Sequence, residues 1–77
     1  MNTREQVLAI LKEVKPTKEL EGINDLIEGG FIDSFELMSL VANLTDKFGI
    51  DITIDELVPE NFNSVDAISE MVERLKG

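Results

Sequence analysis

The 77-residue chain contains no cysteine and no histidine, and these two absences exclude several kinds of chemistry. Without cysteine, the chain can form neither a disulfide nor a thiolate metal site. Without histidine, a serine nucleophile would lack an imidazole base, and a zinc site would lack its usual ligands. We therefore expect no catalytic serine and no metal site.

Aromatic residues and long apolar runs are also scarce. Phenylalanine is the only aromatic residue type, at 4 positions, so we expect a mainly aliphatic core. No apolar run is long enough to span a bilayer, and no segment has the pattern of a signal peptide. We therefore expect a cytoplasmic protein that does not insert into membranes.

Positive charge is limited: 7 lysine and arginine residues stand against 16 acids, for a net charge of −9. Residues 1–18 are weakly basic, so the acidic charge is concentrated in the remainder of the chain. Such a field repels nucleic acid and attracts basic protein surfaces. The charge therefore excludes nucleic acid as a partner and favours basic proteins, although a surface that is merely acidic for solubility is the simpler interpretation.

The first half of the sequence predicts one helix and a long connection within a single domain, residues 1–77. Apolar residues at helical spacing predict a helix over residues 4–15, with Thr3 and Gln6 as its capping box. In the connection, residues 16–32, Thr17 would cap a short turn. The apolar residues expected to pack inward from this connection are Leu20, Ile23, Leu26, Ile27 and Phe31.

The most informative stretch is GGFIDSFELMSLVANLTDKFG, residues 29–49, a glycine turn followed by an amphipathic pattern. Asp33 is placed to cap the helix, and Glu36 completes a capping box. Ser34 is then the first helical residue, and its hydroxyl is not needed for capping. It stands at a helix N-terminus, where an anion is favoured. Gly49 is expected to end the helix.

This helix, residues 34–48, has two apolar stripes when its residues are placed at steps of 100°. The stripe expected to face the core contains Leu37, Val41, Leu44 and Phe48, with Leu40 at its edge. The second stripe contains Phe35, Met38 and Ala42. A surface helix needs only one apolar stripe, so the second is either buried by a neighbouring loop or exposed for a partner.

Beyond residue 49, isoleucines alternate with polar residues at Ile50, Ile52 and Ile54. No second strand is evident, so we expect an extended loop whose isoleucines close the core. Thr53 with Glu56 predicts a capping box that opens a short helix.

The last part of the chain predicts a further turn and a final helix. Pro59 either ends the short helix or begins another turn as its first residue. Ser64 is expected to cap the last helix. The buried stripe of that helix should contain Val65, Ile68, Val72 and Leu75. The predicted fold is all-α, with three long helices, one short helix, and a long loop between helices one and two.

An Asp–Ser pair before a helix is weak evidence alone, because such pairs are caps in most proteins. Here it opens the second helix of a short, acidic, all-α chain after a long packed loop. Gly30, Asp33 and Ser34 form a Gly-x-x-Asp-Ser motif, accompanied by the segments GGFIDSFELMSL, DKFGI, ITIDEL and NSVDAI. On this layout, the whole chain resembles the acyl carrier protein family of phosphopantetheine-binding carriers.

The resemblance implies that Ser34 receives phosphopantetheine from coenzyme A through a separate transferase, with Asp33 assisting recognition or metal placement. The terminal thiol of the arm would hold an acyl or aminoacyl group as a thioester, which supplies the sulfur that the chain lacks. The resemblance also implies that partner enzymes contact a set of residues near the serine. This set is Phe35, Glu36, Met38 and Ala42. The protein would be a monomeric substrate of enzymes and no enzyme itself.

The identity of the carried group divides the hypotheses. The first is an acyl carrier for fatty acid, polyketide or related biosynthesis, which needs an apolar pocket. Its lining would come from Leu37, Leu40, Leu44, Phe48, Ile52, Ile54 and Ile68. The second is a D-alanyl or other aminoacyl carrier loaded by an adenylating ligase, which the segment GFIDS resembles more closely. The third, of another class, is an unmodified acidic helical adaptor in which Asp33 and Glu36 are only a cap.

Overall fold

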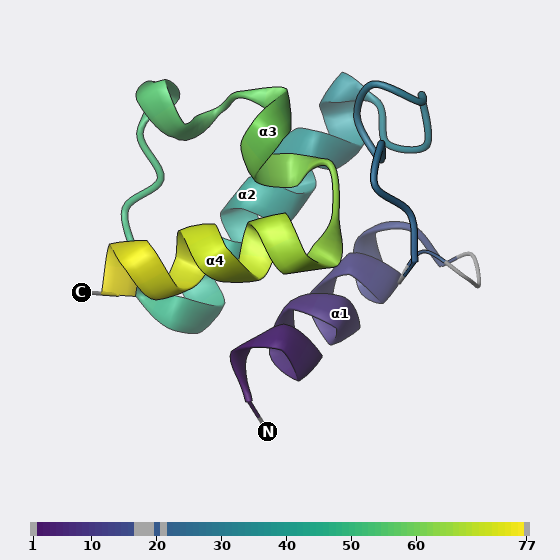
Figure 1. Ribbon diagram of the computed structural model, residues 1–77. Helices are drawn as coiled ribbons and strands as arrows, with labels where there is room; N and C mark the ends of the chain where they lie inside the picture. Colours follow the sequence, from purple (N-terminus) through teal and green to yellow (C-terminus); the bar gives the residue numbers. More distant parts are fainter. Residues whose placement is uncertain (1, 17–19, 21, 77) are drawn as a thin grey trace.

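The computed structural model describes residues 2–16, 20 and 22–76, and this part of the chain is helical without any strand (Figure 1). The long helices are α1 (Thr3–Val14), α2 (Ser34–Phe48) and α4 (Val65–Lys76). The short elements are the 3-10 helix η1 (Ile54–Glu56) and helix α3 (Pro59–Phe62). The predicted all-α bundle with a long loop before α2 is confirmed. The expected cap at Thr17 lies outside the described residues.

The helices enclose one hydrophobic core. Helix α1 contacts both α2 and α4, α2 also contacts α4, and α3 packs on α4 (Figure 1). The buried residues are Val7, Ile10, Leu11, Leu20, Leu26, Ile32, Leu40, Leu44, Ile50, Phe62, Val65, Ile68, Met71 and Val72. With Phe62 as its one aromatic member, this cluster is aliphatic, as the composition predicts.

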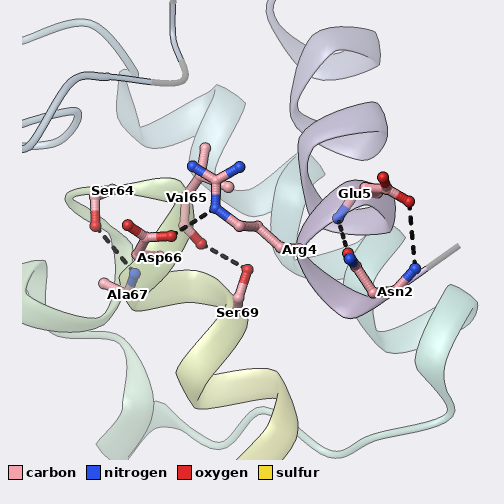
Figure 2. A network of polar contacts seen from close by, with 8 residues as sticks. All are labelled: Asn2, Arg4, Glu5, Ser64, Val65, Asp66, Ala67 and Ser69. Carbon is pink, nitrogen blue, oxygen red and sulfur yellow. Dashed lines mark hydrogen bonds and ion pairs between the residues drawn. The ribbon is translucent and has the colours of Figure 1, made fainter.

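Helix α1 begins one residue earlier than predicted, because Asn2 and not Thr3 is its cap. Asn2 Oδ1 accepts the Glu5 N–H at 2.8 Å, and Glu5 Oε1 accepts the Asn2 N–H at 3.4 Å (Figure 2). Asparagine is a stronger N-cap than threonine. The Thr3 hydroxyl is instead hydrogen-bonded to the Glu73 carboxylate of α4. The predicted Thr3–Gln6 capping box is therefore wrong.

The start of α4 agrees with the sequence. Ser64 Oγ accepts the Ala67 N–H at 3.0 Å, which confirms the predicted cap (Figure 2). Arg4 Nε of α1 lies 2.6 Å from Asp66 Oδ1, so the first turns of α1 and α4 are joined (Figure 2). Of the predicted buried stripe of α4, Val65, Ile68 and Val72 are buried and Leu75 is half-buried, and Met71 is buried in addition.

The segment between α2 and α3 corrects two predictions. Ile50 is buried and Ile52 is half-buried, but Ile54 is 83% exposed, so Ile54 does not close the core. The Thr53 side chain makes no cap hydrogen bond, and its carbonyl accepts the Glu56 N–H at 2.9 Å in a single 3-10 turn. The tight turn ends the two-residue alternation of an extended segment, which leaves Ile54 on the outside. Pro59 begins α3 as its first residue, one of the two alternatives considered.

Two further positions differ from the predicted burial. Leu40 is fully buried and lies in the middle of the buried face of α2, because α2 is covered by both α1 and α4. In the loop, Phe31 is 42% exposed while Ile32 is buried. The Ile32 N–H donates to the Leu26 carbonyl at 3.0 Å, so Ile32 and not Phe31 is held against the buried Leu26.

Candidate functional site

The site is the start of α2, where the predicted capping box is present. Asp33 Oδ1 accepts the Glu36 N–H at 2.8 Å, and Glu36 Oε1 accepts the Asp33 N–H at 3.1 Å. Ser34 is therefore the first residue of the helix, and it is exposed. Within the described part of the chain, no residue hydrogen-bonds to the Ser34 hydroxyl. The local sequence thus leaves one reactive hydroxyl free at the exposed end of a 15-residue helix.

A lysine from α1 balances the acidic charge beside this serine. Lys15 follows the last residue of α1, and its Nζ lies 3.2 Å from Glu36 Oε2. The Glu36 carboxylate therefore takes part both in the capping box with Asp33 and in the ion pair with Lys15, and its side chain is only partly exposed. Sequence reasoning assigned Lys15 no role at the site, since nothing local connects residues 21 positions apart.

The loop before α2 turns at two glycines. A Cβ on Gly29 would lie 2.6 Å from the Asp25 carbonyl oxygen, and Gly30 has φ of +80°, so both positions favour glycine. The loop is bonded to Asn63, the residue that ends α3. Sequence reasoning gave Asn63 no role.

An open groove of about 340 Å³ lies beside the serine. Its lining is Ile27, Gly30, Ile32, Asp33, Ser34 and Leu37. A smaller pocket of about 140 Å³ shares two of these residues and is lined by Ile27, Leu37, Leu57, Val58, Pro59 and Phe62. The groove therefore leads from Ser34 along α2 toward α3.

This lining differs from the predicted acyl pocket. Of the predicted set, only Leu37 borders the groove or the smaller pocket. Leu40, Leu44 and Ile68 are fully buried in the core, and Phe48 and Ile52 pack partly against it. The structure therefore does not gather the predicted residues around a cavity beside Ser34.

The second apolar stripe of α2 faces solvent. Phe35 is 81% exposed and Met38 is 56% exposed, and Ala42 is also exposed. Of the two alternatives, burial by a neighbouring loop is thus excluded for these side chains. A large apolar side chain next to Ser34 is available for contact with another molecule.

The described residues offer neither a cluster of metal ligands nor a membrane-spanning helix. Within residues 2–16, 20 and 22–76, no three acidic side chains are grouped to hold a metal ion. In the same residues, none of the helices has both the length and the apolar character needed to cross a bilayer.

A small helical bundle with a free serine at an exposed helix start has the architecture of a carrier domain. The chain matches the family model described as "Phosphopantetheine attachment site" over residues 5–72. D-alanyl carrier proteins of Staphylococcus saprophyticus and Staphylococcus xylosus are each 31% identical to it over 78 residues, which is 99% of this chain and 100% of each relative. The chain belongs to the phosphopantetheine-binding carrier family.

Members of this family carry a covalently attached phosphopantetheine, and the site fits such a group. The free Ser34 hydroxyl can form a phosphodiester, and the first-turn N–H groups of α2 favour the negative charge that it brings. The groove beside Ser34 offers an apolar surface to a flexible arm. The group supplies a terminal thiol, on which a carrier holds its cargo as a thioester.

Proposed function

We propose that Ser34 is the attachment residue and that the protein carries a small aminoacyl group of the D-alanyl class, loaded by an adenylating ligase. The observation that carries the attachment proposal is the exposed Ser34 hydroxyl, which is not needed for capping because Asp33 is the cap, and which has no hydrogen-bond partner among the described residues. The protein then acts as a substrate and partner of enzymes and performs no catalysis itself.

The other serines of the chain are less suited to attachment. Ser64 Oγ is engaged as the α4 cap, and Ser69 Oγ donates to the Val65 carbonyl at 2.7 Å. Ser39 is half-buried in the middle of α2, away from any helix end. Ser34 alone combines exposure, a free hydroxyl and a position at a helix N-terminus.

The size of the pocket beyond the groove favours a small cargo. Its volume of about 140 Å³ equals that of about five water molecules at roughly 30 Å³ each. A methyl-sized side chain fits such a space, and the groove of about 340 Å³ that leads to it is open at the surface, so neither encloses a long acyl chain. The residues that would have lined a larger pocket, such as Leu40 and Leu44, are packed in the core. The similarity to D-alanyl carrier proteins also supports a small aminoacyl cargo, so a fatty acyl cargo is the weaker hypothesis.

The partners follow from the chemistry of attachment and loading. A phosphopantetheinyl transferase would modify Ser34 with Asp33 assisting recognition, and a ligase would load the arm. The exposed Phe35 and Met38, with Ala42 and Glu36 beside them, would form the docking surface. Apolar anchors of this kind contribute most of the binding energy at interfaces, and methionine adapts to several partners. The compartment that we propose for this role is the cytoplasm.

The attachment is tested by intact-protein mass after incubation with coenzyme A, magnesium and a phosphopantetheinyl transferase. We expect a gain of one phosphopantetheine in the wild type and in the control Ser39→Ala, and none in Ser34→Ala. No gain in the wild type, with a known carrier modified in parallel, would leave the unmodified adaptor as the better hypothesis.

The cargo is tested by loading the modified protein. One reaction contains ATP, D-alanine and a D-alanine-activating ligase, and the other contains ATP, a fatty acid and an acyl-activating ligase. We expect a second mass gain in the first reaction only. A gain with the fatty acid alone would overturn the aminoacyl proposal and leave the attachment proposal intact.

A further inference from the structure

We propose that Asn63 is a positioning residue for modification of Ser34: its side chain holds the loop before α2 in the conformation that the transferase binds. This inference rests on the proposed attachment at Ser34. Asn63 is the C-cap that follows the short helix α3 (Pro59–Phe62), so it lies between α3 and α4, 29 residues after Ser34 in the sequence. Figure 1 shows the loop before α2 and the α3–α4 connection at the same end of the molecule.

Four hydrogen bonds join Asn63 to three consecutive loop residues. Its carbonyl oxygen accepts the Leu26 N–H at 2.9 Å. Its side-chain Oδ1 accepts the Ile27 N–H at 3.0 Å and the Glu28 N–H at 3.2 Å. Its Nδ2 donates to Glu28 Oε1 at 3.0 Å. One amide side chain therefore satisfies two backbone donors of the loop and one of its carboxylates.

The bonded loop residues in turn hold the turn that leads into α2. The Ile27 carbonyl accepts the Gly30 N–H at 3.1 Å, and the Leu26 carbonyl accepts the Ile32 N–H at 3.0 Å. Ile32 directly precedes Asp33, the cap of α2. One series of hydrogen bonds therefore runs from the Asn63 backbone carbonyl through Leu26 to Ile32, the residue before the cap. A second series runs from the Asn63 side chain through Ile27 to Gly30, at the glycine turn, and this second series is the one that a substitution of Asn63 removes.

Asn63 also fixes both walls of the pocket beyond Ser34. Ile27 belongs to the loop wall, and Phe62, the neighbour of Asn63 in sequence, belongs to the α3 wall. Because the Asn63 side chain bonds the Ile27 backbone, it holds these two walls at a fixed separation. The residue thus sets the shape of the surface next to the serine as well as the path of the loop.

Removal of this side chain should reduce the fraction of molecules whose loop is competent to bind the transferase. The two backbone N–H groups would lose their acceptor, and the loop would sample open conformations. When only a fraction of molecules is competent, the apparent affinity falls by that fraction. The chemistry at Ser34 is untouched once the complex forms, so KM for the unmodified carrier should rise while kcat is preserved.

The experiment measures kcat and KM of a phosphopantetheinyl transferase for the unmodified wild type, Asn63→Ala, Asn63→Asp and Asn61→Ala. For Asn63→Ala we expect KM to rise about tenfold, the equivalent of one or two net hydrogen bonds, with kcat unchanged within about twofold. Asn63→Asp keeps an oxygen acceptor for both N–H groups but sets a second carboxylate against Glu28 Oε1, which Nδ2 contacts at 3.0 Å. It is therefore combined with Glu28→Gln, whose amide can donate to the new carboxylate, and the double variant should restore KM to near the wild-type value.

Asn61→Ala is the matched control from the same short helix. Asn61 Nδ2 donates to the Glu56 carbonyl at 2.8 Å and to Glu56 Oε1 at 3.2 Å, and it bonds none of the described residues of the loop before α2. Its loss should perturb α3 while leaving KM at the wild-type value. A tenfold rise in KM for Asn61→Ala would overturn the proposal, because general damage to α3 would then explain the effect.

The remaining outcomes separate this inference from the proposed function. Modification of Asn63→Ala with the wild-type KM would overturn the positioning role and leave attachment at Ser34 intact. No modification of the wild type would overturn the proposed function itself. If Asn63→Ala does not fold, Asn63→Gln replaces it, since the longer side chain displaces the amide and predicts the same rise in KM.

Discussion

The carboxylate of Asp33 has two separable roles, and a pair of substitutions distinguishes them. Asp33→Asn keeps the oxygen that accepts the Glu36 N–H at 2.8 Å but removes the charge, whereas Asp33→Ala removes both. Asparagine caps helices about as well as aspartate, and loss of a cap costs about 1 kcal/mol. We therefore expect Asp33→Ala to be destabilised by about 1 kcal/mol, and Asp33→Asn by much less.

Thermal unfolding followed by circular dichroism measures the first role. For a domain of this size, about 1 kcal/mol lowers Tm by about 4–8 °C. We expect a shift of that size for Asp33→Ala and a shift of about 2 °C or less for Asp33→Asn. Asp46→Asn removes the same charge from an exposed position of α2 and serves as the control.

The transferase assay measures the second role. If the carboxylate assists recognition or metal placement in the transferase, both Asp33 variants lose modification at Ser34, and Asp46→Asn keeps it. Asp33→Asn modified at the wild-type rate would refute a role for the charge. Equal destabilisation of both variants would refute the argument that Asp33 acts on stability as a cap.

Three other predictions concern the surface, the core and the response to pH. Phe35→Ala should leave Tm within a few degrees, because the side chain is 81% exposed, while weakening ligase binding about tenfold or more. Ile54→Ala, at another exposed apolar residue, should change neither quantity; thermal unfolding measures Tm and titration calorimetry measures the binding. Leu44→Ala removes a fully buried side chain of α2 and should lower the free energy of unfolding in urea by about 2–5 kcal/mol; a loss below about 1 kcal/mol would contradict its place in the core. The hydrogen bond from Thr3 lowers the pKa of Glu73 below its ordinary value of 4.5. The charged carboxylate therefore stabilises the fold above pH 4.5, and this stabilisation is lost as the pH falls through the lowered pKa. Glu73→Gln should therefore flatten this part of the Tm profile below about pH 4.5, and an unchanged profile would contradict the assignment.

Contacts within a single helical turn could be predicted from the sequence. The Asp33–Glu36 capping box and the Ser64 cap both form as predicted, and Gly49 ends α2 with φ of +64°. The partners in each cap lie within a few residues of one another, so residue type and spacing are sufficient to specify them. The prediction was wrong at α1, where Asn2 and Thr3 could each cap: the spacing of Thr3 and Gln6 was followed, although asparagine is the stronger cap.

Burial was predicted less well, because it depends on which elements surround a helix. Helical spacing placed Leu40 at the edge of the buried stripe, yet α1 and α4 together make it central. The alternation through Ile54 predicted an inward side chain, but a 3-10 turn places it outside. The apolar pattern of a segment specifies neither the helices that pack against it nor the turn at which it ends.

The sequence by itself determined that α2 begins at Ser34 with a free hydroxyl, because a local cap occupies Asp33 and Glu36. Only the tertiary structure decided what surrounds that hydroxyl: the Lys15 ion pair, the Asn63 bonds to the loop, and the exposure of Phe35. The reason is physical. A cap is a contact within one turn of the chain, whereas these features join residues 21 to 36 positions apart or depend on which faces the packed helices leave uncovered.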